Sequence, residues 1–517
     1  MTPSRYSQTR RLFLKKSIAL GAAGMVPLVY QLEAMAAAAA QHVDSRVEPK
    51  ATHGALDIAA AAPNYKALVC LFMFGGNDNA NFVIPYDLAD YNTYAAARSN
   101  VLAIPRTGDP TLANVNLRGL IPIGPLANQG NRTLAFHPNV GKNNINDPSL
   151  FRSDGIPWLW DNGKLALIGN VGALGAPTTL SQYNNKTVPL PRNLFSHSDQ
   201  QDVWMTNSVT SYSSTGVAGR IADLVDSMNM PAAGVAKIAT CISIAGPNAF
   251  QVSKTTPSYQ MLSSGPQPLS ADYQYYPQYT NAAQNALNAA VNGAYVEQYS
   301  RRRDNLLQAQ WAGMMKYSQQ TFATLNSALA GNPLPGAATF RTGGNPLSQQ
   351  LQMVAKMINA SAPLGLARQI FFVQIGGFDV HGSEFHPQNN ANWNHISEAV
   401  YDFYHAMTTI NAASQVTLFS ASDFGRTLDT NSSGTDHGWG GHHFVTGGAV
   451  AGQQMYGTFP VVAKGTQTDV TRGILLPTTS TDQYYATLAK WFGLSDSDIA
   501  TVLPNLAAFS PANLGFI

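Results

Sequence analysis

The sequence contains few charged residues and has almost no net charge. Asp, Glu, Lys and Arg make up 12% of the 517 residues, and the formal net charge is +2 at pH 7. A typical soluble protein has about 25% charged residues, and a protein that binds nucleic acid or an anionic membrane surface needs a concentrated positive field. The composition therefore excludes nucleic acid as a partner and argues against binding to an anionic membrane.

Cysteine is also scarce, with two residues in the whole chain. Cys70 and Cys241 both lie in apolar, strand-like runs, so we expect buried thiols. A disulfide bond between them remains open if the two strands are neighbours and the compartment is oxidising.

Several catalytic motifs are missing. The chain has no G-x-S-x-G elbow, no H-E-x-x-H helix and no G-x-x-x-x-G-K-[ST] phosphate loop. Glycines at residues 169–175 follow an apolar run, but Pro177 and a polar loop stand where a dinucleotide site needs a helix. The sequence therefore excludes nicotinamide binding and these hydrolase and nucleotide-binding classes.

The N-terminal apolar run is too short for a transmembrane helix. It extends from Ile18 to about Tyr30 and is rich in Gly and Ala, whereas a membrane-spanning helix needs about 20 strongly apolar residues. Small residues at Ala34 and Ala36 suit cleavage by a signal peptidase. We therefore expect a signal peptide over residues 1–40, and no integral membrane segment after its removal.

The residues before this run indicate the export route. Residues 9–15, with Arg10 and Arg11, match the twin-arginine pattern. We therefore expect a periplasmic or secreted protein, with a disordered leader over residues 41–63. Because twin-arginine export carries proteins that have already folded, a metal cofactor can be inserted before the chain leaves the cytoplasm.

Five strand-like segments recur along the rest of the chain. They are nearly continuous in apolar residues, as expected for strands covered by helices on both faces, and they begin at residues 66, 164, 236, 368 and 414. Helical patterns lie between them, for example at residues 216–229. The pattern predicts an α/β domain over residues 64–517, with a mostly parallel central sheet between helices. A shift to Gln, Asn, Tyr and Ala at about 250–345 indicates a helical insertion or cap.

Acidic and imidazole residues follow several of these segments. Asp78 follows the first, Asp379 and His381 follow the fourth, and Asp423 follows the fifth. In an open α/β sheet, reactive groups collect at the carboxyl ends of the strands. Carboxylate oxygen combined with imidazole nitrogen suits zinc, manganese or calcium in a solvent-open site. Because the candidates are too many for one ion, a site with two metal ions is the simplest count.

The stretch TDHGWGGHH at residues 435–443 adds further candidate ligands. Asp436 and His437 are neighbours, so they can face one ion only where the backbone leaves regular strand geometry, and the glycines that follow permit this. We therefore expect a mobile loop that completes the metal centre. In this interpretation His442 is the last imidazole ligand and Trp439 shields the ion from bulk water.

Each candidate also has a structural alternative. Asp78 fits a tight Gly-Gly turn, Asp379 fits a helix cap, and His381 fits an exposed loop. The adjacent His442 and His443 point apart on a regular strand, so only one of them can face an ion. The sequence leaves these alternatives open.

Longer motifs carry a family resemblance over nearly the whole mature chain. They are LFMFGGNDNANFVIPY, FHPNV, LWDNGKLALIGNVG, FSHSDQQDVW, STGVAGRIADL, QIGGFDVH, SDFGRT, DHGWGGHH and LAKWFG. In these motifs the chain resembles a large family of twin-arginine-exported bacterial proteins that is known only as a domain of unknown function. That family is similar to the alkaline phosphatase and sulfatase superfamily. The resemblance implies an alkaline-phosphatase-like fold, one or two divalent metal ions, and a nucleophile at the N-terminus of a helix.

The resemblance assigns roles to the residues at the strand ends. Asp78 resembles the superfamily's metal ligand after the first strand. Asp379 and His381 resemble the pair that binds the other ion, although they are two residues apart here, which is closer than in alkaline phosphatases.

A second part of the resemblance is ambiguous. Asp423 stands in SDFG, where the superfamily has Asp-His-Gly or Asp-Asn-Gly, so Phe424 replaces a ligand. Asp436 and His437 offer another match, with His442 as the last imidazole. Both alignments remain open, and one well-occupied ion with a second weak one is as compatible with the sequence as two strong ones.

The resemblance also points to catalytic residues. The stretch FSHSDQQDVW opens a helix, where N–H groups and the helix dipole favour an oxyanion. Ser196 or Ser198 is the candidate nucleophile, and His197 or Arg426 would neutralise developing charge. Alternatively Ser198 is a helix cap and His197 a structural polar residue. A formylglycine mechanism is excluded unless a serine is modified, because neither cysteine lies in C-x-P-x-R.

These observations predict an exported, metal-dependent hydrolase of phosphate or sulfate esters, acting on a small ester or a polysaccharide ester. The alternative is a non-catalytic binding or assembly protein that retains the fold, for which a protein partner is possible. Phe424 and the uncertain nucleophile favour the alternative, whereas the density of Asp and His at strand ends favours catalysis.

Overall fold

A computed structural model describes most of the chain from Tyr65 onward. The described residues are 65–107, 119–141, 152–233, 235–267, 290, 293–294, 296–301 and 304–517. The predicted signal peptide (1–40) and leader (41–63) lie outside the described residues, as does part of the predicted insertion.

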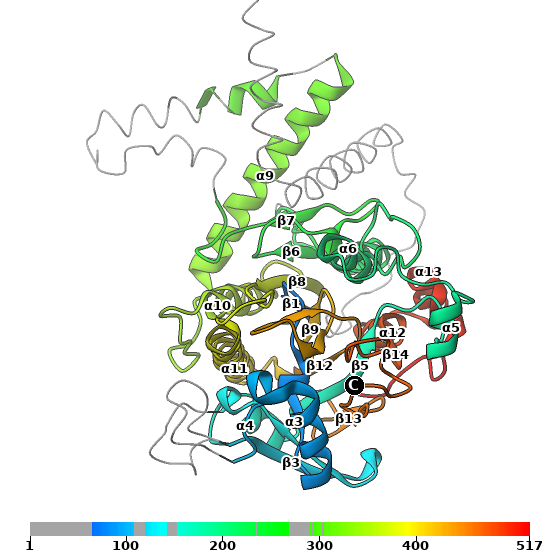
Figure 1. Cartoon of the computed structure of the whole chain (residues 1–517). Helices are drawn as coiled ribbons and strands as arrows, with labels where there is room; N and C mark the ends of the chain where they lie inside the picture. Colours follow the sequence, from blue (N-terminus) through cyan, green and yellow to red (C-terminus); the bar gives the residue numbers. More distant parts are fainter. Residues whose placement is uncertain are drawn as a thin grey trace, which may run out of the picture.

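A nine-stranded sheet forms the centre of the protein (Figure 1). In spatial order its strands are β13 (Met455–Tyr456), β5 (Leu165–Gly172), β12 (Gly441–Gly447), β9 (Val416–Ser422), β1 (Lys66–Met73), β8 (Arg368–Ile375), β6 (Cys241–Ser243) and β7 (Ser258–Gln260), and β14 (Thr479–Ser480) also pairs with β5. Strand β1 is parallel to both of its neighbours, β8 and β9. Among the described strands of this sheet, β12 alone runs antiparallel to its neighbours. The predicted mostly parallel sheet is confirmed.

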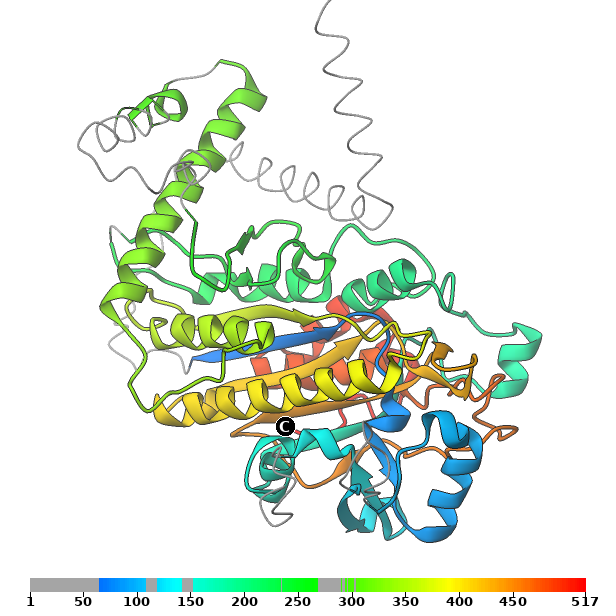
Figure 2. The ribbon, with the colours of Figure 1, turned by 60° about the vertical axis from the view of Figure 1, so that its left-hand side comes forward.

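Helices cover both faces of the sheet (Figures 1 and 2). Alternate residues of β1 belong to two separate apolar cores, with Val69 and Leu71 in one and Cys70 and Phe72 in the other. The first core includes residues of α10 (Pro346–Asn359) and α11 (Phe385–Thr409). The second includes residues of α6 (His197–Thr206), α7 (Val217–Val225) and α12 (Thr481–Phe492). Burial on both faces explains why the strand sequences are almost entirely apolar.

The two cysteines are free and buried. Cys70 on β1 pairs in register with Phe372 on β8, and Cys241 on β6 pairs with Ile370 on the other side of β8. One strand therefore separates them and they are offset by two residues along it, so their backbones are at least about 9–10 Å apart. A disulfide bond spans about 4.4–6.8 Å between Cα atoms, so the open possibility of a bridge is excluded and the expected buried thiols are confirmed.

Smaller elements surround the sheet. A three-stranded sheet has the order β2 (Val83–Pro85), β4 (Arg132–Phe136) and β3 (Ile121–Leu126), and the remaining α-helices are α3 (Leu88–Leu102), α4 (Gly155–Asp161), α5 (Leu180–Asn185), α9 (Leu306–Gly331) and α13 (Asp496–Val502). Helix α9 projects away from the sheet (Figure 2). In the part of the predicted 250–345 insertion that is described, β7 completes the edge of the central sheet, so the helical excursion begins after it.

The stretch around residues 435–447 differs from the expected mobile loop. Residues Thr435–His437 form β11, which pairs with β10 (Arg426–Thr430), and Gly441–Gly447 form β12, which is buried throughout. Trp439 between them is 2% exposed. The glycine-rich segment is therefore not a loop. Strand β12 lies within the central sheet, where β5 and β9 pair with its two edges, and β11 pairs with β10.

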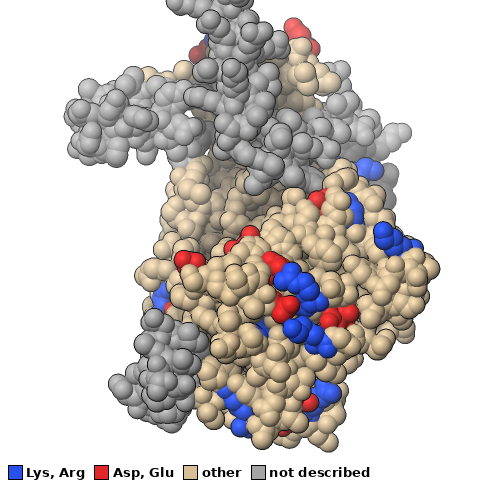
Figure 3. Space-filling model, in the orientation of Figure 1, with Lys and Arg blue, Asp and Glu red and all other residues tan. Residues whose placement is uncertain are grey.

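The surface carries few charges. On the face in Figure 3, acidic and basic side chains of the described residues lie side by side. No helix within the described ranges is long and apolar enough to cross a membrane.

Candidate metal centre

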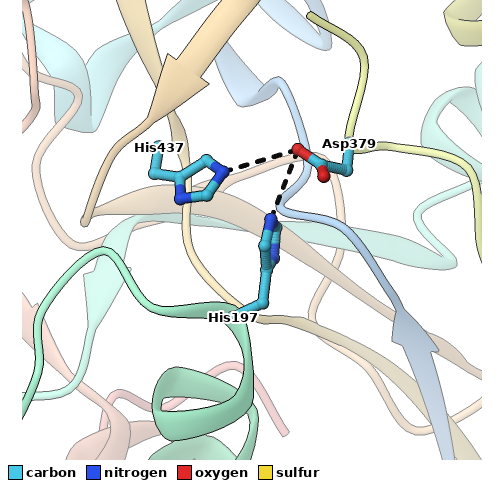
Figure 4. A group of neighbouring side chains, drawn as sticks. All are labelled: His197, Asp379 and His437. Atoms are coloured by element: carbon cyan, nitrogen blue, oxygen red, sulfur yellow. Dashed lines mark ion pairs between the residues drawn. The ribbon is translucent and has the colours of Figure 1, made fainter. Parts of the chain in front are cut away.

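Three side chains from distant parts of the sequence meet near the carboxyl ends of β8 and β9. His197 is the first residue of α6, Asp379 follows β8, and His437 ends β11 (Figure 4). One potential ligand atom from each lies within 4.8 Å of the others. Oδ1 of Asp379 is 3.3 Å from Nε2 of His197 and 3.5 Å from Nε2 of His437. We call these three residues the triad.

The backbone sets the tautomer of His437. Its Nδ1 lies 2.6 Å from the carbonyl oxygen of Phe195, and a carbonyl oxygen can only accept a hydrogen bond. Nδ1 therefore carries the proton, and Nε2 presents its lone pair toward Asp379. Burial lowers the pKa of His437 and so favours this neutral form.

A carboxylate orients His197 in the same way. Its Nδ1 is 2.7 Å from Oδ2 of Asp423, which is buried at the end of β9. Burial lowers the pKa of His197, but the hydrogen bond and charge of Asp423 and the charge of Asp379 raise it overall. A carboxylate that accepts from the far nitrogen of an imidazole is a common support for metal-binding histidines.

The two imidazoles fit a metal ion. Neither Nε2 of His197 nor Nε2 of His437 has a hydrogen-bond partner in the part of the chain that the structure describes, although both atoms are buried. An unpaired polar atom in such a position costs free energy. Two nitrogen lone pairs and one carboxylate oxygen form a donor set suited to a divalent transition-metal ion.

His381 also approaches Asp379, but with the opposite tautomer. Its Nδ1 is 2.9 Å from Nδ2 of Asn431. The orientation of that amide is fixed, because its oxygen accepts from the N–H of Gly434 and its nitrogen donates to Asp436. The amide N–H therefore donates to Nδ1 of His381, so Nε2 carries the proton, and Nε2 lies 2.8 Å from Oδ1 of Asp379. In this arrangement His381 holds Asp379 rather than offering a lone pair.

Arg426 also orients the carboxylate of Asp379. Its guanidinium, whose side chain is fully buried, donates to Oδ1 of Asp379 at 3.1 Å and to the carbonyl oxygens of Gly75 and Thr435. Burial raises the pKa of Asp379, but Arg426, His197 and His381 lower it overall. Asp379 is therefore an ionised carboxylate with little freedom to rotate.

Two of the predicted ligands are ion-paired outside the triad. Asp78 pairs with the buried guanidinium of Arg98, which also donates to the carbonyl oxygen of Thr427. Asp436 accepts from Arg472 at 2.6 Å, and the pKa of Asp436 is lowered overall, although burial opposes the shift. Asp436 contacts Asn431 and His381, and these contacts link it indirectly to Asp379.

His442 is not brought to the triad. Its Nδ1 accepts a hydrogen bond from the backbone N–H of Asn170, and its ring stacks on Phe459. His443 lies on the opposite face of β12, beside Ser420 and Trp204. The two adjacent imidazoles point apart, as the period of a strand predicts, and burial lowers the pKa of each to about 3.

The candidate nucleophiles lie at the start of α6. Ser196 is the N-cap residue, but its hydroxyl donates to Oδ2 of Asp199 at 2.8 Å instead of capping the helix. Ser198 lies in the first turn, 3.3 Å from the hydroxyl of Ser196. Phe424 packs against the rings of His197 and His437, at 4.8 and 4.9 Å between centroids, and forms a wall of the site.

Sequence reasoning named Asp423, Arg426 and His381, which orient triad members, but it missed other groups around them. The carbonyl of Phe195 leaves no mark in a side-chain pattern, and Asn431 lies in a turn that reads as a surface loop. Gln201 donates to Asp423 at 2.9 Å and comes four residues after His197. That helical spacing is a signal that could have identified Gln201.

Comparison with solved structures finds nine matching chains. One is Ps i-CgsB in complex with k-i-k-neocarrahexaose, with 8% identity and a TM-score of 0.28, over 84% of this chain and 74% of that one. Another is a mutant of alkaline phosphatase PafA, with 12% identity and a TM-score of 0.21, over 72% of this chain and 65% of that one. These TM-scores are too low to support a conclusion about activity. Comparison with curated proteins finds no match.

A protein-family model covers most of the chain. Its description is "Protein of unknown function (DUF1501)", and it matches residues 65–505. The matched range includes every strand of the central sheet, the triad, and the residues that orient it. The chain therefore belongs to this family of proteins of unknown function.

Proposed function

We propose that this protein is an exported hydrolase of phosphate or sulfate esters that depends on a divalent metal ion held by His197, Asp379 and His437. The observation that carries the proposal is the pair of unpartnered Nε2 atoms facing one carboxylate oxygen. Nitrogen donors favour zinc or manganese over calcium, which prefers oxygen. The substrate is a small ester or an ester group on a polysaccharide.

The residues around the triad prepare it for ester chemistry. A bound divalent ion would polarise the ester and lower the pKa of a coordinated water. Arg426 and His381 hold Asp379 in one orientation, and Asp423 and the Phe195 carbonyl do the same for the two imidazoles. The rigid arrangement avoids reorganisation during the reaction.

Helix α6 supplies a second element of the proposed site. Its first residue is a triad member, and the side chain of its N-cap residue, Ser196, does not cap it. The N–H groups of its first turn are free to donate to an ester oxyanion. Ser196 remains the proposed nucleophile, with an attack by water as the alternative.

Metal analysis combined with a single variant tests the proposal. Protein purified from the periplasm is expected to contain zinc or manganese by inductively coupled plasma mass spectrometry, and to hydrolyse 4-nitrophenyl esters of phosphate or sulfate. His437→Ala should lose both the metal and the activity. His395→Ala is the control, because the hydrogen bond at His395 uses its backbone carbonyl. Metal-free protein with full activity would contradict the proposal.

One observation favours a second candidate function. Phe424 stands at the end of β9, where the resembling superfamily has a metal ligand, and it packs on two triad members. A binding or assembly protein that retains the fold would tolerate this replacement. Stoichiometric metal without turnover of any phosphate or sulfate ester would favour that candidate.

A further inference from the structure

We infer that Arg426 takes the place of a second cation, so that the centre binds one divalent ion and accepts an ester group with a single negative charge. The inference rests on the proposed function, because it concerns the same site. It goes further by naming the ion count and the charge class of the substrate.

One carboxylate contacts Arg426, and the charges of two more act on it. Asp379 accepts from its Nη1 at 3.1 Å. Burial lowers the pKa of Arg426, whereas the negative charges of Asp379, Asp78 and Asp423 oppose that shift. An arginine keeps its proton in such surroundings, because its ordinary pKa is above 12. The guanidinium is therefore a permanent positive charge among the carboxylates that would otherwise hold a metal ion.

The guanidinium cannot swing aside. Nε donates to the hydroxyl of Thr435 at 3.0 Å, Nη2 donates to its carbonyl oxygen at 2.7 Å, and Nη1 donates to the carbonyl of Gly75 at 3.0 Å. Gly76 packs directly beside it, since a Cβ there would lie 3.3 Å from Cδ of Arg426 and closer still to Phe424. Phe424 and Gly76 therefore leave no space for the side chain of Arg426 to move on one side, and the carbonyl groups of Gly75 and Thr435 hold its guanidinium on the other.

The charges at the site leave room for one divalent ion. Asp78, Asp379 and Asp423 contribute three negative charges, and Arg98 and Arg426 contribute two positive ones. The residual single negative charge becomes a single positive charge when one divalent ion binds. A second divalent ion would leave three positive charges beside the buried side chains of Asp78, Asp423 and Arg426, where unbalanced charge is costly.

Two of the ion pairs farther out do not change this count. Asp436 pairs with Arg472 and Asp429 pairs with Lys464, so each pair is neutral. A site with one positive charge complements a sulfate monoester or a phosphodiester, each of which carries one negative charge. A phosphate monoester carries about two negative charges above its second pKa of about 6 and is less well matched.

Two buried oxygen atoms make the ion count testable. Oδ1 of Asp78 and Oδ1 of Asp423 have no hydrogen-bond partner among the residues that the structure describes. Carboxylate oxygens without a partner are potential ligands for a second ion, and the guanidinium of Arg426 lies among the charges of these carboxylates. The number of bound ions therefore decides between the two arrangements.

The experiment is a manganese titration of the metal-stripped full chain. Bound manganese per chain is measured by plasma mass spectrometry, and the coupling between ions by electron paramagnetic resonance. We expect one ion per chain and an uncoupled six-line spectrum, both abolished in His437→Ala. Two ions per chain or a spin-coupled spectrum would overturn the inference and leave the proposed function intact. Failure to bind any ion would overturn both.

A second measurement tests the substrate class. With one ion bound, kcat/KM for bis(4-nitrophenyl) phosphate or 4-nitrophenyl sulfate should exceed that for 4-nitrophenyl phosphate by at least about tenfold. A preference for the doubly charged monoester would overturn the charge match without removing the hydrolase assignment. No turnover of the three esters would overturn the hydrolase assignment and the substrate class, while the single-ion result would stand on its own.

Discussion

Three histidines lie near Asp379. In each of them the hydrogen-bond partner of Nδ1 determines whether Nε2 offers a lone pair or a proton. In their neutral forms, His197 and His437 have Nδ1 bonded to an oxygen acceptor and present a lone pair at Nε2. His381 has Nδ1 bonded to an amide donor and presents a proton at Nε2. Three imidazoles that look alike in the sequence therefore divide into two potential ligands and one hydrogen-bond donor.

This division makes a prediction for His381. His381→Ala should keep the number of bound ions and weaken their affinity by about 10- to 100-fold, which is the usual effect of removing a group that supports a ligand. Isothermal titration calorimetry with zinc measures both quantities. His437→Ala is the comparison, and an equal loss of stoichiometry in the two variants would show that His381 is itself a ligand.

A buried carboxyl group far from the triad makes the protein sensitive to pH. Asp482, near the start of α12, is 0% exposed, and burial outweighs the opposing effects of Asn207 and Arg220 on its pKa. Burial raises the pKa of Asp482 to about 7, above the value of about 3.9 in an unfolded chain. The folded state is therefore favoured below pH 4 and loses stability as the pH rises toward 7.

Asp482→Asn should remove this loss. The free energy of unfolding at pH 8 is expected to rise by up to about 4 kcal/mol, with a much smaller gain at pH 5. Thermal unfolding followed by circular dichroism at the two pH values measures the effect. Asp496→Asn is a control, since the Asp496 side chain is 87% exposed. A variant that is less stable than the natural chain at pH 8 would contradict the prediction.

At the scale of elements, the glycines at 438–441 serve close packing rather than loop mobility. A Cβ on Gly440 would lie 2.1 Å from Oδ1 of Asn170, and one on Gly438 would lie 2.5 Å from the carbonyl oxygen of Gly425. A Cβ on Gly441 would meet its nearest atoms at 3.6 Å, which is an ordinary contact. The neighbouring backbone, not a need for flexibility, therefore explains the first two glycines.

This difference gives a matched pair of variants. Gly440→Ala should lower the free energy of unfolding by about 1–3 kcal/mol because of overpacking, while Gly441→Ala should change it by less than about 1 kcal/mol. Urea unfolding monitored by tryptophan fluorescence compares the two. Equal destabilisation would indicate that the segment tolerates no side chain for a reason other than these contacts.

Sequence patterns identified the parallel strands because their apolar runs are long and end in polar residues. They also located Asp379 and Asp423, since strand ends converge at one edge of a sheet. They missed β12, because GHHFVTG contains two histidines whose burial depends on β5 and β9. They also placed His442 at the predicted metal centre, whereas strand register directs its side chain toward Asn170. Such contacts between distant segments are not encoded in local spacing.

At the scale of the whole molecule, the export route is a separate prediction. Replacing both Arg10 and Arg11 with Lys should leave the protein in the cytoplasm, because the translocase reads the arginine pair. Cell fractionation followed by immunoblotting measures the distribution. Changing Lys15 and Lys16 to Arg keeps the positive charge and should leave export unchanged. Normal periplasmic accumulation of the twin-lysine variant would contradict the twin-arginine assignment.

The position of β1 has a consequence for synthesis. The register of the sheet joins Lys66 to Arg368 on one side and Ala67 to Val416 on the other, so β1, the first of the described strands, pairs with segments that are made about 300 and 350 residues later. Until those segments are made, the apolar side chains of β1 are exposed and both of its hydrogen-bonding edges are unpaired. Both features favour aggregation. Native contacts that span so much chain also slow folding. We therefore expect the nascent chain to need a chaperone, and folding to finish only after release from the ribosome.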